Sequence, residues 1–326
     1  MRKIILGIIA SCSFSVLLTG CATTNAKYYY ESAVLEFEAE NYDEALENIS
    51  SAIEQSPDKK EYYVCSGMIN IGLGNYEKAL EDFGKGFSDG TEDIDNENNK
   101  SAYRGRGIVY LYLGKYTEAI TDFDKALSYE CLSEMDTDIK EFKIEALIRS
   151  EDYNQASVLC DEVIKSEGEK SELLILKGAC ESKLSQYDSA KTYFDKALKE
   201  GNNLAYYYLS IMYKEQGKLE EAVSAIKEYM NKDKNADKGA VYCDIASSYI
   251  EANEFQKAID TITEGYNYAD DDTKKILMRN EIAAIEGKLD FSAAYSKAQE
   301  YIALYPDDEV VLKEIEFLKT RIPATQ

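Results

Sequence analysis

The phrase NYDEAL, Asn41 to Leu46, recurs along the chain as a large apolar residue followed three positions later by alanine. The later copies are NYEKAL (Asn75 to Leu80), KYTEAI (Lys115 to Ile120), DYNQAS (Asp152 to Ser157), QYDSAK (Gln186 to Lys191), KLEEAV (Lys218 to Val223), EFQKAI (Glu254 to Ile259) and DFSAAY (Asp290 to Tyr295). The shared alanines, separated by 32 to 40 residues, are Ala45, Ala79, Ala119, Ala156, Ala190, Ala222, Ala258 and Ala294. This regular period indicates a solenoid, in which each small unit buries its faces against its neighbours.

Positions around each alanine repeat as well. An aromatic residue stands 16 positions before the alanine at Tyr29, Tyr63, Tyr103, Tyr206 and Tyr242. A glycine stands 12 positions before it at Gly67, Gly107 and Gly178, and a phenylalanine four positions after it at Phe83, Phe123 and Phe194. Small residues let two helices approach closely, and large aromatic residues fill the gaps between successive hairpins. Gly74, Gly114 and Gly217 lie at the expected turns between helices, where glycine tolerates positive φ.

These residues resemble the tetratricopeptide repeat, with tyrosine in place of its usual tryptophan. The resemblance extends from about Lys27 to Pro306 and implies an all-α, right-handed superhelical solenoid of helical hairpins. We expect a signal peptide over 1–20, a short linker over 21–26, about eight hairpins over 27–307, and a capping helix and tail over 308–326. The apolar face of the capping helix, expected over Asp308 to Ile322, would consist of Val310, Val311, Ile315 and Leu318.

The fourth and eighth repeats depart from the pattern, and one turn carries an insertion. The fourth repeat has Ile144 at the glycine position and Cys160 at the phenylalanine position, and the eighth has Ile282 and Ala298 there. We expect both repeats to pack irregularly. The acidic insertion SDGTEDIDNENN, residues 88–99, is predicted to lengthen the turn after the second repeat.

The N-terminus has the features of a secretory signal. Arg2 and Lys3 precede a mostly apolar run over Ile4 to Leu18, which is too short to span a bilayer. The sequence LTGC that ends at Cys21 resembles the lipobox of bacterial lipoproteins. The resemblance implies cleavage between Gly20 and Cys21, attachment of diacylglycerol to the Cys21 sulfur, and a lipid-anchored position on the extracytoplasmic face of a bacterial membrane. The alternative is an ordinary cleaved signal in which Cys21 is incidental.

The charge and composition disfavour several classes of function. The formal net charge of −24 would repel nucleic-acid phosphates and anionic lipid headgroups, so membrane attachment would depend on the acyl chains. The chain has no histidine, no P-loop and no GxGxxG sequence after a strand. We therefore expect no enzymatic activity and no cofactor.

Two features of the sequence could suggest further sites. Asp93, Asp95 and Glu97 resemble the start of a calcium loop, but Asn98 replaces the required glycine and Arg104 the final acid, so no metal site is expected. Once Cys12 is removed and Cys21 acylated, the remaining cysteines are Cys65, Cys131, Cys160, Cys180 and Cys243. They lack CxxC spacing and are odd in number, which disfavours a disulfide framework but leaves one bridge possible outside the cytoplasm.

The resemblance also implies a concave groove lined by the first helix of each hairpin. The residues expected to project into it are Tyr30, Val34, Met68, Arg104, Ile108, Phe142, Ile175, Tyr207, Tyr208 and Ile211. An apolar, aromatic groove of this kind suits an extended peptide or a partner helix. The alternative for each residue is a contact with the next hairpin. The lysine and asparagine of the family's carboxylate clamp are not matched, because Ile108 stands where asparagine would be needed.

These observations predict a membrane-tethered scaffold or adaptor that binds protein or peptide partners. One alternative is an accessory or solute-binding lipoprotein of a transport or envelope-assembly system, although solute-binding lipoproteins usually have α/β lobes. Others are an envelope hydrolase, for which no nucleophile or metal constellation is found, and a cytosolic helical scaffold whose N-terminus only resembles a signal.

Overall fold

The computed structural model describes residues 25–234 and 236–322, and every regular element in these ranges is helical. The prediction of an all-α fold is therefore confirmed. The chain divides into two compact units, Met1–Leu184 and Ser185–Gln326. The predicted signal peptide, its cleavage site at Gly20 and the lipid-attachment residue Cys21 lie outside the described residues.

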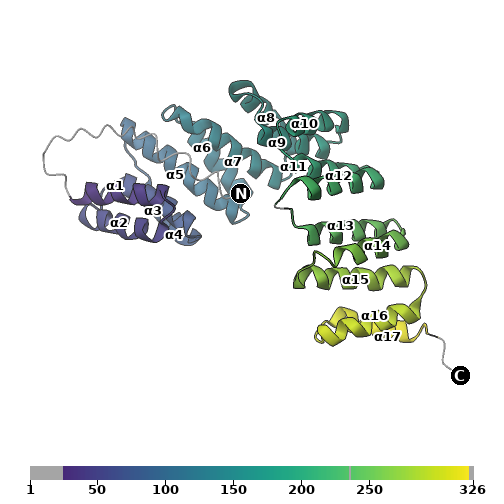
Figure 1. Cartoon of the computed structure of the whole chain (residues 1–326). Helices are drawn as coiled ribbons and strands as arrows, with labels where there is room; N and C mark the ends of the chain where they lie inside the picture. Colours follow the sequence, from purple (N-terminus) through teal and green to yellow (C-terminus); the bar gives the residue numbers. More distant parts are fainter. Residues whose placement is uncertain (1–24, 235, 323–326) are drawn as a thin grey trace. The chain divides into compact units, whose positions relative to one another are not determined.

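The described part of the first unit consists of four sequential pairs of helices followed by one further helix. The two helices of a pair pack against each other, and the second also packs against the first helix of the next pair (Figure 1). The elements are α1 (Asn25–Glu38), α2 (Tyr42–Gln55), α3 (Lys60–Gly72), α4 (Tyr76–Gly86), α5 (Asp93–Tyr112), α6 (Tyr116–Leu127), the 3-10 turn η2 (Ser133–Met135), α7 (Asp136–Arg149), α8 (Tyr153–Glu167) and α9 (Ser171–Lys183).

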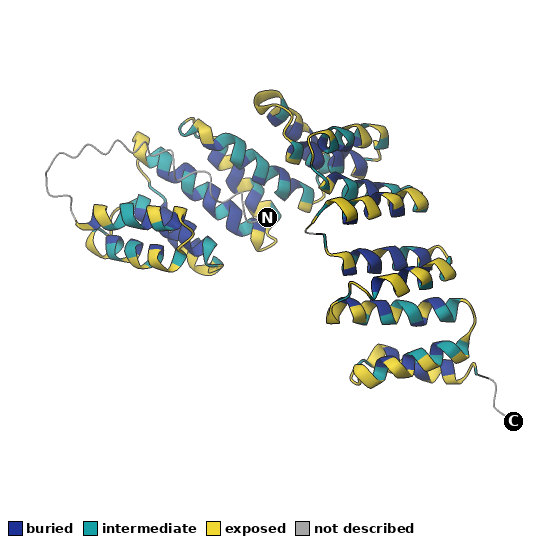
Figure 2. Ribbon diagram, viewed as in Figure 1, coloured by how far each residue is buried: buried dark blue, intermediate teal, exposed yellow. Residues whose placement is uncertain are grey.

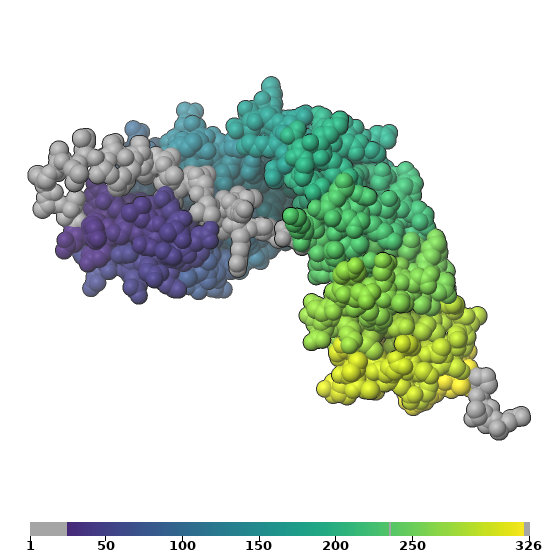
Figure 3. Space-filling model, viewed as in Figure 1, coloured from purple at the N-terminus to yellow at the C-terminus, as the bar shows by residue number. Residues whose placement is uncertain are grey.

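The second unit follows the same plan. Its elements are α10 (Tyr187–Lys199), α11 (Leu204–Glu215), α12 (Leu219–Lys232), α13 (Lys238–Glu251), α14 (Phe255–Gly265), α15 (Asp271–Gly287), α16 (Phe291–Leu304) and α17 (Glu309–Lys319). In both units the buried residues lie on the helix faces that meet other helices (Figure 2), and side chains fill the spaces between neighbouring ribbons (Figure 3). None of the helices in the described ranges is both long and apolar enough to cross a membrane.

The turn within each repeat requires a left-handed backbone at one position. The predicted glycines Gly74, Gly114 and Gly217 have φ of 75°, 72° and 70°. The position five residues before the repeat alanine also has positive φ in the other repeats, at Glu40, Glu151, Ser185, Asn253 and Leu289. At the first glycine turn, the amide of Asn75 donates to the carbonyl of Asn70 at 2.8 Å, which closes a helix C-terminus of the Schellman type. The backbone therefore dictates this conformation even where the residue is not glycine.

A repeated contact between a small and a large residue joins the two helices of a hairpin. A Cβ atom added to Gly67 would lie 2.7 Å from the ring of Phe83, and one added to Gly107 would lie 2.7 Å from the ring of Phe123. Both phenylalanines are fully buried. Seven of the eight repeat alanines have no exposed surface, and Ala222 is 6% exposed. The helices thus approach as closely as the small residues allow.

In the fourth and eighth repeats, the residues at the glycine and phenylalanine positions are buried together. Ile144 and Cys160 are fully buried in one apolar cluster, and Ile282 and Ala298 are buried in another. Both pairs have the 16-residue separation of Gly107 and Phe123. At these two positions an isoleucine and a small residue stand where other repeats have a glycine and a phenylalanine, and this exchange conserves much of the total volume. Both repeats therefore bury these positions, and the expectation that their helices pack irregularly stays a prediction.

The acidic insertion changes a helix more than a turn. Helix α5 begins at Asp93, so the turn is lengthened to residues 87–92 as predicted, but the second half of the insertion is helical. Glu92 and Asp95 form a reciprocal capping box, in which the amide of Glu92 donates to Asp95 at 3.1 Å. The side chain of Asp95 also accepts a hydrogen bond from the Ser88 hydroxyl. Carboxylates at a helix N-terminus satisfy free amides and the helix dipole, which explains why the acidic segment folds this way.

Helix α17 covers the last hairpin of the second unit. Val311, Ile315 and Leu318 are buried in a cluster with residues of α15 and α16, as predicted for a capping helix. Val310 was predicted on the same face, but it is 66% exposed because it precedes the buried stripe by one position. Asp308 caps the helix by accepting from the amide of Val311. A hydrogen bond from the Tyr301 hydroxyl, together with Arg279, lowers the pKa of Asp308 to about 2.

The exchange of sizes between repeats predicts a rescue. Gly107→Ile should destabilise the first unit by about 1–3 kcal/mol, because the side chain would overlap the Phe123 ring. Adding Phe123→Cys should recover part of that loss by recreating the pair at Ile144 and Cys160. Urea unfolding followed by circular dichroism measures both. Gly84→Ala is the control, since its Cβ meets nothing within 4 Å in a helix and should stabilise by about 0.5–1 kcal/mol. A double variant no more stable than Gly107→Ile would contradict this account.

A pair of carboxyl groups makes the docking of α17 depend on pH. Burial and a hydrogen bond with Glu314 raise the pKa of Glu286 from 4.5 to about 7. Because the folded pKa is raised, the stabilisation is fully present below about pH 4.5 and is lost as pH rises through 7. We expect the melting temperature of the wild type, measured against Glu286→Gln at each pH, to fall between pH 5 and pH 8. Comparing the two proteins at each pH removes the general effect of pH on an acidic chain. A difference in melting temperature that does not change with pH would show that Glu286 is not the group responsible.

Candidate functional site

The ten residues predicted to line a groove divide by burial. Tyr30, Val34, Tyr207, Tyr208 and Ile211 are half-buried, whereas Met68, Arg104, Ile108, Phe142 and Ile175 are buried. The first seven along the chain belong to the first unit and the last three to the second. The two sets are therefore described separately.

In the first unit, one predicted residue, Arg104, contacts two others, Phe142 and Met68. Arg104 is 3% exposed, and its guanidinium lies 5.7 Å from the centre of the Phe142 ring. Its Nη1 lies 4.0 Å from the sulfur of Met68, and its Nε donates to Asp138 at 2.5 Å. The remaining nitrogen, Nη2, is buried and has no hydrogen-bond partner in the described part of the chain. These residues come from α3, α5 and α7, so the structure brings together the first helices of three successive hairpins.

The other predicted residues of the first unit also make contacts between hairpins. Tyr30 stacks on Tyr62 with ring centres 4.9 Å apart, and Val34 packs against the main apolar cluster of this unit. Ile108 is fully enclosed, and Ile175 is 3% exposed. Most of the predicted groove residues of the first unit therefore pack within the unit. This agrees with the alternative that each residue contacts the next hairpin rather than a partner. Their contact with a partner stays a prediction.

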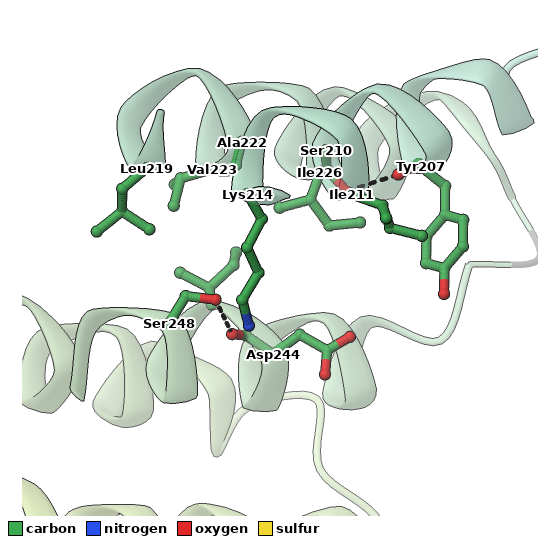
Figure 4. A pocket seen from close by; sticks show the side chains of 11 residues that line it. Tyr207, Ser210, Ile211, Lys214, Leu219, Ala222, Val223, Ile226, Asp244 and Ser248 are labelled. Atoms are coloured by element: carbon green, nitrogen blue, oxygen red, sulfur yellow. Dashed lines mark hydrogen bonds between the residues drawn. The ribbon is translucent and has the colours of Figure 1, made fainter. Parts of the chain in front are cut away.

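In the second unit, a pocket of about 200 Å³ opens between α11, α12 and α13. Figure 4 shows side chains from the α11–α12 hairpin facing those of α13 across it. Its apolar lining consists of Ile211, Leu219, Ala222, Val223, Ile226 and Ile245. The predicted groove residues Tyr207 and Ile211 both line this pocket.

Polar groups from two helices stand at the rim. The side chain of Lys214 on α11 extends toward the backbone of Asp244 on α13 (Figure 4), and its ammonium lies 3.3 Å from a carboxylate oxygen of Glu251. Burial beside the apolar wall raises the pKa of Asp244, and the charge of Lys214 acts to lower it. The Ser248 hydroxyl donates to the backbone carbonyl of Asp244 at 2.8 Å. The pocket thus combines an apolar floor with one cation and one anion at its edge.

The aromatic side of the pocket is held by tyrosine packing. Tyr207 lies 5.6 Å from Tyr208 and 5.7 Å from Tyr229, measured between ring centres. Tyr208 stacks on Phe194 of α10 with ring centres 6.1 Å apart. Of these two neighbouring residues of α11, Tyr207 therefore lines the pocket and Tyr208 packs against α10. The prediction named both tyrosines, and the structure places Tyr207 at the pocket.

Sequence reasoning missed the charged residues of this site. Lys214 follows Tyr207 by seven positions, which puts both on one face of α11. Asp244 stands 14 residues before Ala258, as Tyr208 does before Ala222. The repeat register could therefore have indicated Asp244, but its charge suggested an ordinary solvated residue.

Comparison with protein families agrees with this architecture. Models of the tetratricopeptide repeat match residues 30–87, 101–131 and 181–237. No curated protein matches the chain.

Solved structures share the fold at low sequence identity. A tetratricopeptide repeat protein from Parabacteroides merdae is 14% identical with a TM-score of 0.61, and the match covers 81% of this chain and all of that one. The pilF protein of Pseudomonas aeruginosa is 14% identical with a TM-score of 0.52, covering 65% of this chain and 93% of that one.

Stacked helical hairpins joined by contacts between small and large residues define a helical repeat protein suited to binding proteins or peptides. The matching models and the shared fold identify the family more closely. The chain contains tetratricopeptide repeats, which the family models match over residues 30–87, 101–131 and 181–237.

The rim of the pocket can be tested through the titration of Asp244. We expect its pKa to lie above the ordinary value of 3.8, because the apolar wall disfavours the charged carboxylate. Lys214→Met should raise this pKa further by removing the nearby positive charge, whereas Lys214→Arg should leave it nearly unchanged. Carboxyl chemical shifts followed by NMR against pH measure the effect. A pKa that is insensitive to Lys214→Met would mean that the two groups do not interact.

Proposed function

We propose that the chain is a membrane-tethered scaffold that binds a protein or peptide partner on the extracytoplasmic side of a bacterial membrane. The observation that carries the binding part is the pocket between α11, α12 and α13. Its volume of about 200 Å³ is below the roughly 300–1,000 Å³ of typical small-molecule sites. One apolar side chain of a larger partner suits this space better than a whole small molecule.

The charges at the rim favour a peptide ligand. A peptide backbone carries both donors and acceptors, so Lys214 can donate to a carbonyl while Asp244 accepts from an amide. Tyr207 adds a large, rigid contact surface of the kind enriched at binding hot spots. An apolar anchor in the pocket and polar contacts around it together make the proposed binding mode.

The membrane part of the proposal rests on the N-terminal sequence. A positive region, an apolar run and the LTGC sequence occur in the order of a lipoprotein signal, before the first described helix at Asn25. The helix thus begins two residues before the predicted start near Lys27. Lipid on Cys21 would hold the first hairpin near the membrane surface, because three intervening residues span at most about 14 Å.

The all-helical fold argues against the alternative of a solute-binding protein with α/β lobes. A catalytic role has little support, because the chain lacks histidine and its described residues contain no metal-ligating cluster of three or more side chains. We therefore favour binding over catalysis.

Peptide display tests the binding part. Peptides selected on the chain should share an apolar anchor residue, and Ile211→Asp should weaken their binding at least about tenfold by placing a charge in the pocket. Ile276→Asp is the matched control, since Ile276 is 46% exposed on α15 and does not line the pocket. Circular dichroism establishes that both variants fold. Equal affinity in the two variants would exclude this pocket as the binding site.

Metabolic labelling tests the anchor. Cells that express the chain with an alkyne analogue of palmitate should label the wild type and Cys12→Ala but not Cys21→Ala, and the last variant should leave the membrane fraction. Cys12 is a suitable control because it lies in the part removed by cleavage. Labelling of Cys21→Ala would refute the lipoprotein assignment without affecting the peptide-binding result.

A further inference from the structure

The fourth hairpin leaves a cysteine where its neighbours place an aromatic ring. Cys160 stands four residues after Ala156, as Phe83 and Phe123 stand after their repeat alanines. Phe83 reaches the next hairpin, since a Cβ atom added to Gly105 of α5 would lie 2.2 Å from its ring. A residue of this register therefore faces the following hairpin, and Cys160 on α8 should face α9.

The residue that Cys160 meets on α9 is another cysteine. Cys180 precedes Glu181, which Ser157 of the Cys160 helix contacts at 2.8 Å, and the Cys180 side chain is the first cause of the raised pKa of Cys160. Both residues are fully buried, belong to the same apolar cluster and are free thiols. Two interacting thiols in one buried cluster on two packed helices are close to the arrangement that a disulfide requires.

Hydrogen bonds beside the cysteines hold α8 and α9 in register. The hydroxyl of Ser157, three residues before Cys160, donates to Glu181, the residue after Cys180, at 2.8 Å. Lys177 on α9 donates to Ser157 and to Asp161 on α8, each at 2.7 Å. Bridging the two sulfurs would therefore need only a small local adjustment of helices already joined.

The other described cysteines lie in different surroundings. Cys243 belongs to the second unit and donates to the carbonyl of Thr273 at 3.5 Å. Cys65 is buried in the separate cluster around α3, and Cys131 lies half-buried in the segment after α6. Neither shares a cluster with the Cys160 and Cys180 pair.

We propose that Cys160 and Cys180 form an intrachain disulfide that joins α8 to α9 when the folding chain meets a disulfide oxidant. One cysteine thiolate attacks the oxidant's disulfide and releases one of its sulfurs as a thiol. The second cysteine then attacks this mixed disulfide and releases the other. The chain loses two protons and two electrons, and the oxidant's disulfide is reduced to two thiols.

The packing also determines when the bridge can form. The hydrogen bond with Cys180 and burial raise the pKa of Cys160 well above its ordinary value, and Lys177 offsets this only in part. The reactive thiolate is therefore scarce in the closed structure, and the oxidant cannot reach the fully buried sulfurs. The bridge forms during folding, and the folded reduced chain reacts slowly.

Refolding under defined redox conditions tests the proposal. The purified full chain is unfolded, refolded with oxidised and reduced glutathione or with dithiothreitol alone, alkylated and mapped by mass spectrometry. The glutathione sample should contain a peptide pair that links Cys160 to Cys180, two hydrogen masses lighter than the sum of the reduced peptides. Its first unit should melt roughly 5–10 °C higher than in the reduced sample.

Matched variants separate this bridge from general oxidation. Cys180→Ser should remove the linked peptide and the redox-dependent shift in melting temperature, while Cys65→Ser should retain both. If Cys180→Ser does not fold, the peptide map of the wild type decides alone. Recovery of Cys160 and Cys180 as alkylated thiols after oxidative refolding, or linkage of either to a different cysteine, would overturn the proposal.

Discussion

The structure depends on the close approach of helices over a small side chain that faces a large one. The ring of Phe83 occupies the space that a Cβ atom would take at Gly67 in its own hairpin and at Gly105 in the next. One side chain therefore sets the spacing within a hairpin and the spacing to its neighbour. Phe123 repeats the contact over Gly107. Dispersion contacts of this kind are individually weak, but they are lost together if the helices separate, so each hairpin is stable mainly beside its neighbours.

Much of this fold could be predicted because its main constraint is local and periodic. The interval between alanines located every turn, and the glycine and phenylalanine positions identified the faces that meet. The left-handed turns were recognised at glycines such as Gly74 but not at Glu151 or Leu289, which adopt φ of 63° and 64°. A glycine in the sequence indicates such a turn. A non-glycine residue is held there by the hydrogen bonds that close the helix, at a cost of roughly 1–2 kcal/mol that the packing must offset.

The candidate site was less predictable because it depends on contacts between distant residues. Helical spacing placed Tyr207 and Ile211 on one face of α11, and both line the pocket. The burial of Arg104 could not be foreseen, since its partner Asp138 follows 34 residues later and Arg104 resembles a surface cation in the sequence. Asp244 was missed for a related reason. In a chain with 61 acidic residues, the few that face apolar walls can be recognised only from their neighbours in space.

The fourth hairpin shows how buried charge can accompany an altered core. Its Ile144 and Cys160 are buried in one apolar cluster, but a cysteine offers the next hairpin much less surface than a phenylalanine. Lysines of the third and fifth hairpins bond to the fourth hairpin on both sides. Lys100 is fully buried and donates to the carbonyl of Cys131, which precedes α7, at 2.5 Å. It also donates to Asp136, the first residue of α7, at 2.6 Å. On the other side, Lys177 of α9 donates to Ser157 of α8. A buried ion pair adds little net stability, because desolvation opposes the attraction, but an unpaired buried charge is costly. A shifted register would leave such charges unpaired, so these contacts specify how the fourth hairpin aligns with its neighbours where the aromatic ring is missing.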